Sequence, residues 1–529
     1  MSLLTAAPVE TIVAPSVDFV AIMPVLILLG AAVISVVVEA AAGRKARYPL
    51  QVGLSAVAIL GAGAWTVVAG SKSHFAVTLA GAISVDQATY VMWGILLALA
   101  LVSVLLMADR VSEPGGAFVA QAAARIGSAR DRTAALTATP MQTEVFPLTL
   151  FAISGMMVFP AASDMITLFI ALEVLSLPLY LMCGLARRRR LISQEAAVKY
   201  FLLGAFASAI LLYGIALLYG YAGSLRFADI AAVSQAGGRN DLLLLIGMAL
   251  LVVGLLFKGS VGPFHSWTPD VYQGAPTPVT AFMASCTKVA AFAAMLRIFM
   301  VAFEPTSWSW RGVMWAVAIA SMLIGAIIGI TQTDLKRVLA YSSVAHAGFL
   351  LLGVISLSEK GVSSTLFYLL TYGFATIGAF ALLTLVRSGE GEAPHLSAWA
   401  GMAKKSPVLA GIMTLFLLSF AGIPLTSGFI GKLTIFTAAT ESGMAPLVVV
   451  AMVATAITAF FYLRVVVLMY FAAPVPVTGG VDDSETVAVA LPGAFTMIVI
   501  AVCAAVTLLL GLLPSAVIDL LTVHFPLLS

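Results

Sequence analysis

The chain has 529 residues, of which 61% are hydrophobic and only 10% carry a charge. An ordinary soluble domain has about 25% charged residues, so this composition excludes a soluble globular protein and places most of the chain in lipid. The net charge is only +3, so the positions of the charges along the sequence are more informative than their sum.

Apolar runs between turn signals predict fourteen membrane spans and therefore an all-α polytopic membrane protein. A bilayer core needs about 20 apolar residues per helix, and the chain is long enough for this number. The first run lacks the basic start and A-x-A site of a cleavable signal peptide, so we expect it to be retained. The predicted spans lie near 18–41, 50–70, 84–109, 144–161, 163–185, 194–220, 241–264, 276–302, 310–331, 335–357, 362–387, 406–439, 445–471 and 489–515.

The connections between these spans alternate in basic charge. One set holds sixteen basic residues: Arg44, Lys45, Arg47, Arg110, Arg125, Arg130, Arg132, Arg187 to Arg190, Lys336, Arg337, Arg387, Lys404 and Lys405. The other set holds six: Lys72, Arg226, Arg239, Arg297, Arg311 and Lys360. The positive-inside rule assigns the first set to the cytoplasm, which predicts both termini on the outer side.

Three polar segments outside the spans receive no catalytic role. The insert 111–142 has a composition that suits a short surface helix, and the acidic segment 481–485 is expected to be a solvated loop. Arg187 to Arg190 are expected to anchor the chain at the interface, with anionic lipids as natural contacts.

Sequence motifs for cofactors are missing. Cys183, Cys286 and Cys503 lie far apart inside apolar runs, a spacing that supports neither an iron–sulfur cluster nor a zinc site nor a disulfide framework. Neither a G-x-G-x-x-G turn after a strand nor a P-loop is present. We therefore expect this chain to bind no cofactor, no metal and no nucleic acid.

Few ionisable residues lie near the middle of a span. Lys258 and Lys288 each interrupt an apolar segment, at a cost of roughly 2.5–3.5 kcal/mol. The connection between them holds four prolines, Pro263, Pro269, Pro276 and Pro278. The other midspan groups are Glu173, His346 and Lys432. Ionisable residues at membrane depth commonly mark a path for charge.

Several other polar positions allow two interpretations. Glu195 and Lys199 are four residues apart with the carboxylate first, which fits an interfacial ion pair worth less than about 1 kcal/mol as well as a functional pair. His346 is either a satisfied core group or a proton carrier, because imidazole titrates near neutral pH. Arg464 lies in the thirteenth span. Three carboxylates at span ends are expected to be solvated: Glu39, Asp86 and Asp109.

Helix-breaking residues accompany two of the lysines. Gly259, Gly262 and Pro263 follow Lys258, whereas Gly422, Pro424, Gly428 and Gly431 precede Lys432. A broken helix at membrane depth is tolerated where it is buried in protein or lines a hydrated cavity. The sequence therefore predicts that the seventh and twelfth spans are discontinuous.

The spacing of these groups suggests an internal repeat. Glu173 precedes Lys258 by 85 residues, and His346 precedes Lys432 by 86 residues. Matching broken segments in two halves are typical of inverted-repeat transporters. We divide the chain into an N-terminal part at 1–143, five-span halves at 144–303 and 309–472, and a last helix at 489–515. A carboxylate that moves toward or away from a buried lysine would switch it between holding and releasing a proton, so the row predicts a proton path.

Four segments resemble the proton-conducting membrane subunits of respiratory complex I, NADH:quinone oxidoreductase. They read FKGSVGPFHSWTPDVYQGAPTPVTAF with ASCTKVAAF, LEVLSLPLYLM, TDLKRVLAYSSVAHAG and FAGIPLTSGFIGK. The strong motifs cover roughly 140–470. The family includes subunits of multi-component sodium/proton antiporters and membrane-bound hydrogenases. One subunit type of the family has a glutamate where Lys432 stands, so the resemblance is to a type that keeps the lysine.

The resemblance implies a multi-pass subunit of the cell membrane with two inverted five-helix repeats. It implies that Glu173 is the carboxylate partner of Lys258, that Lys288 is the central relay, and that His346 leads to Lys432. It also favours a functional Glu195–Lys199 pair. Flavin, iron–sulfur clusters and quinone would bind to partner subunits of a hetero-oligomeric translocase. A cation/proton antiporter subunit or a membrane-bound hydrogenase subunit is the alternative; a solute transporter is weaker, because no polar constellation fits a solute.

Overall fold

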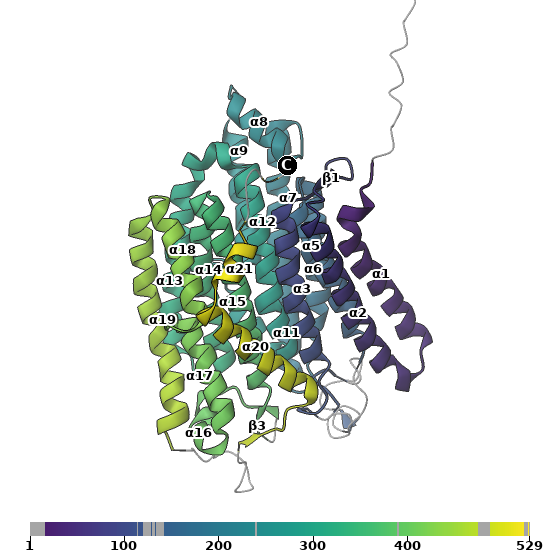
Figure 1. Cartoon of the computed structure of the whole chain (residues 1–529), viewed down its shortest axis with the longest axis vertical. Helices are drawn as coiled ribbons and strands as arrows, with labels where there is room; N and C mark the ends of the chain where they lie inside the picture. Colours follow the sequence, from purple (N-terminus) through teal and green to yellow (C-terminus); the bar gives the residue numbers. More distant parts are fainter. Residues whose placement is uncertain are drawn as a thin grey trace, which may run out of the picture.

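The computed structural model describes residues 16–113, 115–119, 128–129, 133, 142–238, 241–388, 391–473, 487–522 and 527. Within these ranges the chain forms a bundle of long helices, most of which lie along a common axis (Figure 1). Most of the insert 111–142 and all of the acidic segment 481–485 lie outside the described residues, so the expectations for them stay open.

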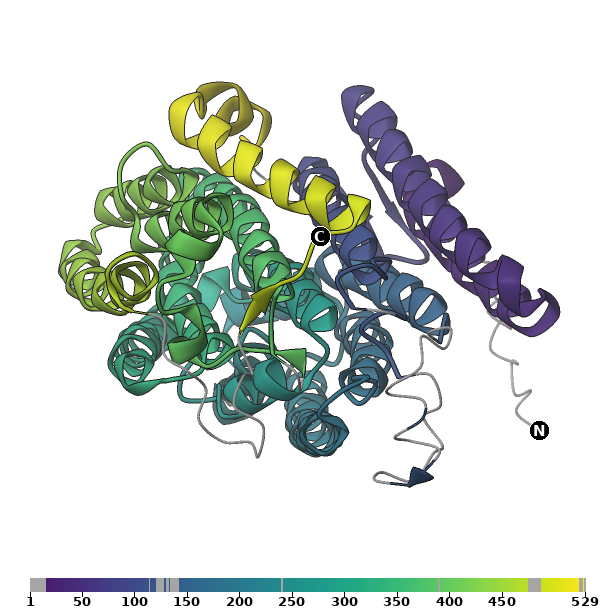
Figure 2. The same cartoon turned by 90° about the horizontal axis from the view of Figure 1, so that it is seen from below.

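The first two helices form one edge of the bundle, and the third packs inside it (Figure 2). The carboxylate of Asp18 accepts hydrogen bonds from two of the first backbone N–H groups of α1 and so caps that helix. A short hairpin separates the second and third helices. The elements are α1 (Phe19–Ala41), α2 (Arg44–Ser71), β1 (Ala76–Thr78), β2 (Ile83–Val85) and α3 (Gln87–Met107).

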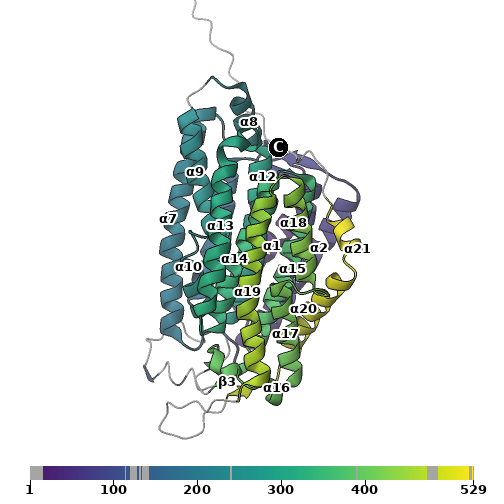
Figure 3. The same cartoon turned by 90° about the vertical axis from the view of Figure 1, so that its left-hand side faces the viewer.

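The next part contains the first interrupted span. The elements are α5 (Val145–Ala161), α6 (Met165–Cys183), α7 (Arg190–Ala222), α8 (Phe227–Ala236), α9 (Asp241–Lys258), α10 (Trp267–Gly274), α11 (Thr277–Phe282), the π-helical turn η1 (Met283–Thr287) and α12 (Lys288–Val301). The short α10 packs against α7 and α14 below the end of α9 (Figure 3).

The following part contains the second interrupted span. Its elements are η2 (Glu304–Thr306), α13 (Ser307–Thr331), α14 (Leu335–Ser356), α15 (Glu359–Leu383), β3 (Val386–Ser388), β4 (Gly391–Glu392), η3 (Leu396–Trp399), α16 (Met402–Lys405), α17 (Pro407–Ala421), α18 (Ser427–Glu441) and α19 (Ala445–Phe471). After it, β5 (Ala488–Val489) pairs antiparallel with β3, and α20 (Ala494–Leu512) crosses the bundle obliquely before α21 (Ser515–Leu520) (Figure 1).

Every predicted span overlaps a described helix. Twelve helices of the described part are long and apolar enough to cross a membrane, and two shorter apolar helices, α5 and α17, overlap the remaining two predicted spans. The all-α polytopic class and the two helix breaks are confirmed. The number of crossings and the inverted repeat remain predictions.

Three helices form the centre of the bundle. Nearly all side chains of α14 and α15 are buried, as are those of the span formed by α11, η1 and α12 up to Phe299. The outer helices, such as α1, α7 and α19, expose large apolar side chains on one face. The centre therefore excludes lipid, and polar side chains on these three helices must find partners within the protein.

The connections that carry most basic residues gather at one end of the bundle. At this end β3 pairs with β5, Phe118 forms a bridge with Ala186, and Lys336 pairs with Glu392. We call it the basic end. At the other end Ile83 forms a bridge with Ala162, and Asp164 with Arg226. Among the basic residues that the structure describes, the predicted alternation holds, except that Arg297 lies on no connection: it is buried in α12.

Candidate functional site

The first helix break follows Lys258, the last residue of α9. Ser260 then adopts a left-handed conformation with φ of 58°, and α10 begins only at Trp267. Two freed backbone groups find partners: the Gly262 N–H donates to Ser321 Oγ at 3.0 Å, and the Trp267 indole donates to the Phe257 carbonyl at 3.0 Å. The break is thus buried in protein, as membrane depth requires.

Lys258 lies in a pocket of hydroxyl and aromatic groups. Its side chain is buried, and Nζ donates to Ser176 Oγ at 2.7 Å and to the Tyr200 hydroxyl at 3.1 Å. The same nitrogen lies 5.3 Å from the centre of the Tyr200 ring and 5.8 Å from that of Tyr180, within cation–π range. Neutral oxygens and ring faces surround the lysine, and none of these contacting groups is a carboxylate.

Glu173 stands one helical turn before Ser176 on α6, on the face that reaches Lys258. The side chain is half-buried, and its Oε1 is buried without a hydrogen-bond partner among the described protein atoms. The contacts of Lys258 Nζ within the described residues are hydroxyls, and Glu173 is not among them. A water molecule or a rotation of the carboxylate would therefore be needed to link them.

Lys288 begins α12 directly after the π-helical turn η1. Single π turns occur often at functional positions. The buried Nζ donates to the Ser343 carbonyl at 2.6 Å and to Ser343 Oγ at 2.7 Å, and it lies 5.6 Å from the centre of the Tyr372 ring. The lysine therefore joins α12 to α14 in the middle of the bundle.

His346 lies on the same face of α14 as Ser343, one turn further on. Its Nδ1 is 2.6 Å from the Tyr368 hydroxyl, and its Nε2 is 3.2 Å from the Tyr462 hydroxyl. The Tyr462 hydroxyl is also hydrogen-bonded to Ser342. Both ring nitrogens are thus engaged, which an imidazole that passes protons requires and which a satisfied core histidine would also display.

The second break precedes Lys432. The helix α17 ends at Ala421, Gly422 follows with φ of 79°, and α18 begins at Ser427. Lys432 Nζ donates to the carbonyls of Phe420 at 2.8 Å and Ala421 at 3.2 Å. The same nitrogen lies 5.1 Å from the ring centre of Phe349, one turn beyond His346 on α14. One face of α14 therefore extends from Lys288 past His346 to Lys432.

The Glu195–Lys199 pair is part of a larger row of charges. Lys199 Nζ lies 2.7 Å from Glu195 and 2.7 Å from Asp270 on α10. Asp270 also accepts from Arg337 on α14 at 2.8 Å. The Lys199 side chain is 42% exposed and that of Glu195 is 61% exposed, so this row lies on a lateral surface of the chain. It links the first broken span to α14.

Hydroxyl groups of three tyrosines are the main partners that sequence reasoning missed. Tyr200, Tyr368 and Tyr462 are fully buried. A buried phenol needs a hydrogen-bond partner for its hydroxyl. A tyrosine within an apolar run is therefore the one sequence feature that indicates a buried polar contact. Arg464, in the thirteenth predicted span, donates at 2.9 Å to the Ile330 carbonyl at the end of α13 and lies on the surface.

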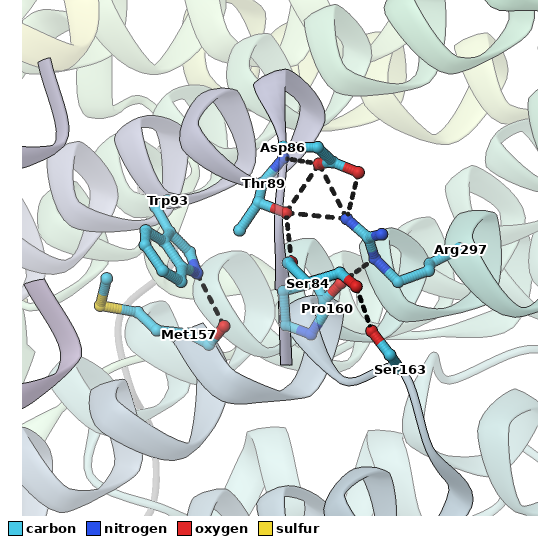
Figure 4. A network of polar contacts seen from close by, with 8 residues as sticks. All are labelled: Ser84, Asp86, Thr89, Trp93, Met157, Pro160, Ser163 and Arg297. Carbon is cyan, nitrogen blue, oxygen red and sulfur yellow. Dashed lines mark hydrogen bonds and ion pairs between the residues drawn. The ribbon is translucent and has the colours of Figure 1, made fainter. Parts of the chain in front are cut away.

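The prediction of solvated carboxylates at span ends was wrong. Asp86 and Arg297 form a buried ion pair, with Arg297 Nη2 at 2.9 and 3.0 Å from the two carboxylate oxygens (Figure 4). The guanidinium also contacts the Thr89 hydroxyl and, through Nε, the Pro160 carbonyl at 2.6 Å. These contacts clamp α12 against α3 and α5.

The other two carboxylates are also engaged. Asp109 is 8% exposed and accepts hydrogen bonds from Ser112 and from Thr496 on α20. Glu39 pairs with Arg47 at 3.3 Å and accepts from Thr143 at 2.6 Å. All three carboxylates lie at helix ends and join elements that are distant in sequence, because these helix ends pack against other elements instead of facing water.

Ligand groups for a metal do not gather in the part of the chain that the structure describes. No cluster there contains three or more His, Cys, Asp or Glu side chains placed to hold an ion. The three cysteines are buried, separate and free. The site thus consists of lysines, hydroxyls, one imidazole and one unpartnered carboxylate oxygen, a set suited to holding and passing protons.

Comparison with known proteins identifies the family. Residues 162–458 match the family model described as NADH:quinone oxidoreductase/Mrp antiporter, TM. The chain is 59% identical to NADH-quinone oxidoreductase subunit N of Saccharopolyspora erythraea, with 96% of this chain and 97% of the relative covered. It is 54% identical to NADH-quinone oxidoreductase subunit N 3 of Streptomyces griseus, with 98% and 95% covered.

Solved structures agree with these relatives. A chain of respiratory complex I from Thermus thermophilus with bound aureothin is 30% identical and superposes with a TM-score of 0.74, with 94% of this chain and 99% of that chain covered. A chain of the Mrp complex from a Dietzia species shares the fold, with a TM-score of 0.77, at 23% identity and with 96% of both chains covered. The chain therefore belongs to the NADH:quinone oxidoreductase/Mrp antiporter family of membrane proteins and, within it, to subunit N of NADH-quinone oxidoreductase.

Proposed function

We propose that the chain translocates protons across the cell membrane as subunit N of a respiratory NADH:quinone oxidoreductase, driven by quinone reduction in other subunits. The observation that carries this proposal is the row of three buried lysines, each with neutral oxygen partners, along two broken helices and one face of α14. Burying a charged amine without a carboxylate partner is costly, so each lysine exchanges protons more readily than a solvated one would.

Each residue of the row has a role in the proposal. Lys258 holds a proton while Glu173 is near and releases it when the carboxylate turns away. Lys288 takes up the proton in the middle of the bundle, where Ser343 holds it, and His346 passes it toward Lys432 through Tyr368 or Tyr462. The exposed Glu195–Lys199 pair would contact a neighbouring subunit and respond to a change of charge there.

The two breaks support a division into two halves. In the half at 144–303 a lysine precedes the break, and in the half at 309–472 a lysine follows it. Opposite orientation of two related halves would place one break in reach of each membrane side. By the positive-inside rule the basic end faces the cytoplasm and both termini lie outside. Flavin, iron–sulfur clusters and quinone would be held by partner subunits.

The proposal is tested with Lys258→Ala in the assembled complex. Inverted membrane vesicles are energised with NADH, and proton uptake is followed with a pH-sensitive dye while native gels report assembly. We expect assembled complex with proton uptake lost. The control is Lys360→Ala, which removes an exposed lysine at the opposite end from the basic connections. Normal pumping by the Lys258 variant would overturn the proposal, and sodium-dependent proton movement without NADH oxidation would favour an antiporter subunit.

A further inference from the structure

Two carboxylates, the buried Glu113 and the half-buried Glu392, lie in one charge cluster at the basic end. Glu113 Oε1 lies 3.3 Å from Arg188 and 3.3 Å from Arg387, and Glu392 lies 2.8 Å from Lys336 and accepts a hydrogen bond from Thr277. Their side chains are 10% and 17% exposed. Arg187 also faces Glu113 and donates to the Gly115 carbonyl. The cluster therefore brings together five segments that are distant in sequence.

Two cavities adjoin both carboxylates. The smaller, of about 10 Å³, also reaches Asp109 and Thr496. The larger, of about 50 Å³, extends from the exposed Arg189 to Gln273 and Thr277. A cavity of roughly 10–15 Å³ with polar walls suffices for one water molecule. Water can therefore reach both carboxylates from the surface of the basic end.

The two carboxylates differ in their tendency to hold a proton. Burial raises the pKa of Glu113, which its pairing with Arg387 and Arg188 only partly offsets and which the negative charge of Glu392 reinforces. Burial would also raise the pKa of Glu392, but Lys336 outweighs it and lowers that pKa. Neighbouring carboxylates whose pKa values are pushed apart are typical of an acid and a base that work together.

The larger cavity is lined on one side by Gln273 and Thr277, which lie next to elements of the proposed relay. Thr277 is the first residue of the span that continues to Lys288, and Gln273 accepts from Arg337, which pairs with Asp270 beside Lys199. The cavity thus borders the proline-rich connection between Lys258 and Lys288. No other element separates the two carboxylates from α11.

We propose that Glu113 and Glu392 are the groups through which protons enter this chain from the aqueous phase at the basic end. A hydrated proton in the larger cavity is transferred to the Glu113 carboxylate and leaves a neutral water molecule behind. The Glu113 carboxyl then gives the proton to a water molecule beside Thr277, where the negative charge of Glu392 stabilises it, and Glu113 regains its charge. The inference rests on the proposed function, because it supplies protons to Lys258 and Lys288.

The test uses Glu113→Gln and Glu392→Gln, each in the assembled complex in NADH-energised inverted vesicles. Glutamine keeps the shape of the side chain and cannot ionise. Both variants are expected to assemble and to lower NADH-driven proton uptake several-fold, whereas Glu113→Asp restores it. The control is Glu441→Gln, which removes an exposed carboxylate of an ion pair at the other end of the bundle and is expected to pump normally.

The pH profile separates proton uptake from a structural role. A proton-accepting Glu113 gives wild-type turnover a pH dependence that Glu113→Gln changes, whereas a purely structural cluster lowers the amount of assembled complex and leaves that dependence as it was. If Glu392→Gln fails to assemble, Glu113→Gln decides, because it keeps the Lys336–Glu392 bridge. Normal pumping by Glu113→Gln with pumping still lost in Lys258→Ala would overturn this inference and leave the proposed function standing.

Discussion

The ammonium group of Lys432 lies 2.8 Å from the carbonyl oxygen of Phe420, so the lysine proposed to end the relay also caps the helix before the break. The last carbonyls of a helix have no partner within it and form the negative end of the helix dipole. In α17 two of these carbonyls accept hydrogen bonds from the Lys432 ammonium group, and neither partner is acidic. Loss of a proton from that group would leave the carbonyls of Phe420 and Ala421 with a neutral amine, which ties the state of the lysine to the shape of the break.

Gly422→Ala tests this link. A methyl group at Gly422 would lie 2.9 Å from Cδ of Lys432, on a residue with φ of 79°. We expect a loss of more than about 1 kcal/mol in stability, the minimum for a side chain forced into positive φ, together with impaired proton uptake. Gly443→Ala is the matched control, because its φ is 78° and nothing lies within 4 Å of the added methyl group. Thermal stability of the complex and dye quenching measure both effects; equal pumping by the two variants would contradict the link.

Asp86→Asn is expected to be strongly destabilising. It leaves the Arg297 guanidinium, which is 1% exposed, without its carboxylate, and breaking a buried pair from one side costs about 3–5 kcal/mol. Replacing both partners by apolar residues is expected to cost less, because no unpaired charge remains. The readout is the thermal unfolding midpoint of the assembled complex. A midpoint close to wild type for Asp86→Asn would show that the clamp contributes nothing.

Tyr462→Phe is expected to impair proton transfer more than Tyr368→Phe. The Tyr462 hydroxyl contacts both His346 and Ser342, whereas the Tyr368 hydroxyl contacts only one imidazole nitrogen. Each lost hydrogen bond costs about 0.5–1.5 kcal/mol, so neither variant should unfold the chain. Protons pumped per NADH are measured, with Tyr470→Phe, at a more exposed site, as the control. The reverse order would mean that protons pass His346 by way of Tyr368.

The Lys336–Glu392 bridge should stabilise the chain in a pH-dependent way. Because the pKa of Glu392 is lowered in the folded state, its contribution is complete above the ordinary carboxyl value of about 4.3 and is lost as the pH falls through the lower folded-state value. The difference in thermal midpoint between wild type and Glu392→Gln is therefore expected to be constant near neutral pH and to shrink in acid. A difference that grows on acidification would refute the assignment.

The contribution of the Glu113 carboxyl to stability should depend on pH in the opposite direction. Burial raises its pKa in the folded state, so its stabilising contribution is complete below the ordinary value and is lost as the pH rises through the raised value. Glu113→Gln is expected to gain stability relative to wild type as the pH increases across that interval. Thermal scans of the assembled complex over a pH series check this, with Glu441→Gln expected to follow wild type.

Local patterns were sufficient for the helices and their breaks. Hydropathy locates a span because each helix is apolar enough to cross a bilayer, and Gly422 or Pro263 breaks a helix through its own backbone. Lys258, Lys288 and Lys432 stood out because a charge in an apolar run is costly whatever surrounds it. The family resemblance added the expected roles of these lysines, of Glu173 and of His346 along the proton path.

Partners that meet only through packing could not be predicted. Asp86 and Arg297 are 211 residues apart, and at the sequence level each resembled a solvated group next to a span. Asp270 joins Lys199 because the short α10 packs against α7, which no local pattern specifies. The tyrosines that contact His346, Tyr368 and Tyr462, come from two helices that follow it in the chain. The apolar sequence around them does not show which group their hydroxyls will contact.

Because of the π-helical turn at 283–287, the effect of a one-residue deletion in this span depends on where the deletion lies. A π turn accommodates one residue more than an α-helical turn, so it behaves as an insertion kept within the helix. Deleting one residue there would restore a regular helix and leave its two flanking parts in nearly the same rotation, whereas deleting one residue from α11 would rotate everything before it by about 100° relative to Lys288. After a deletion in α11, Thr277 and the cavity at the basic end would face a different side of the lysine. The span should therefore tolerate a one-residue deletion within 283–287 better than one within α11.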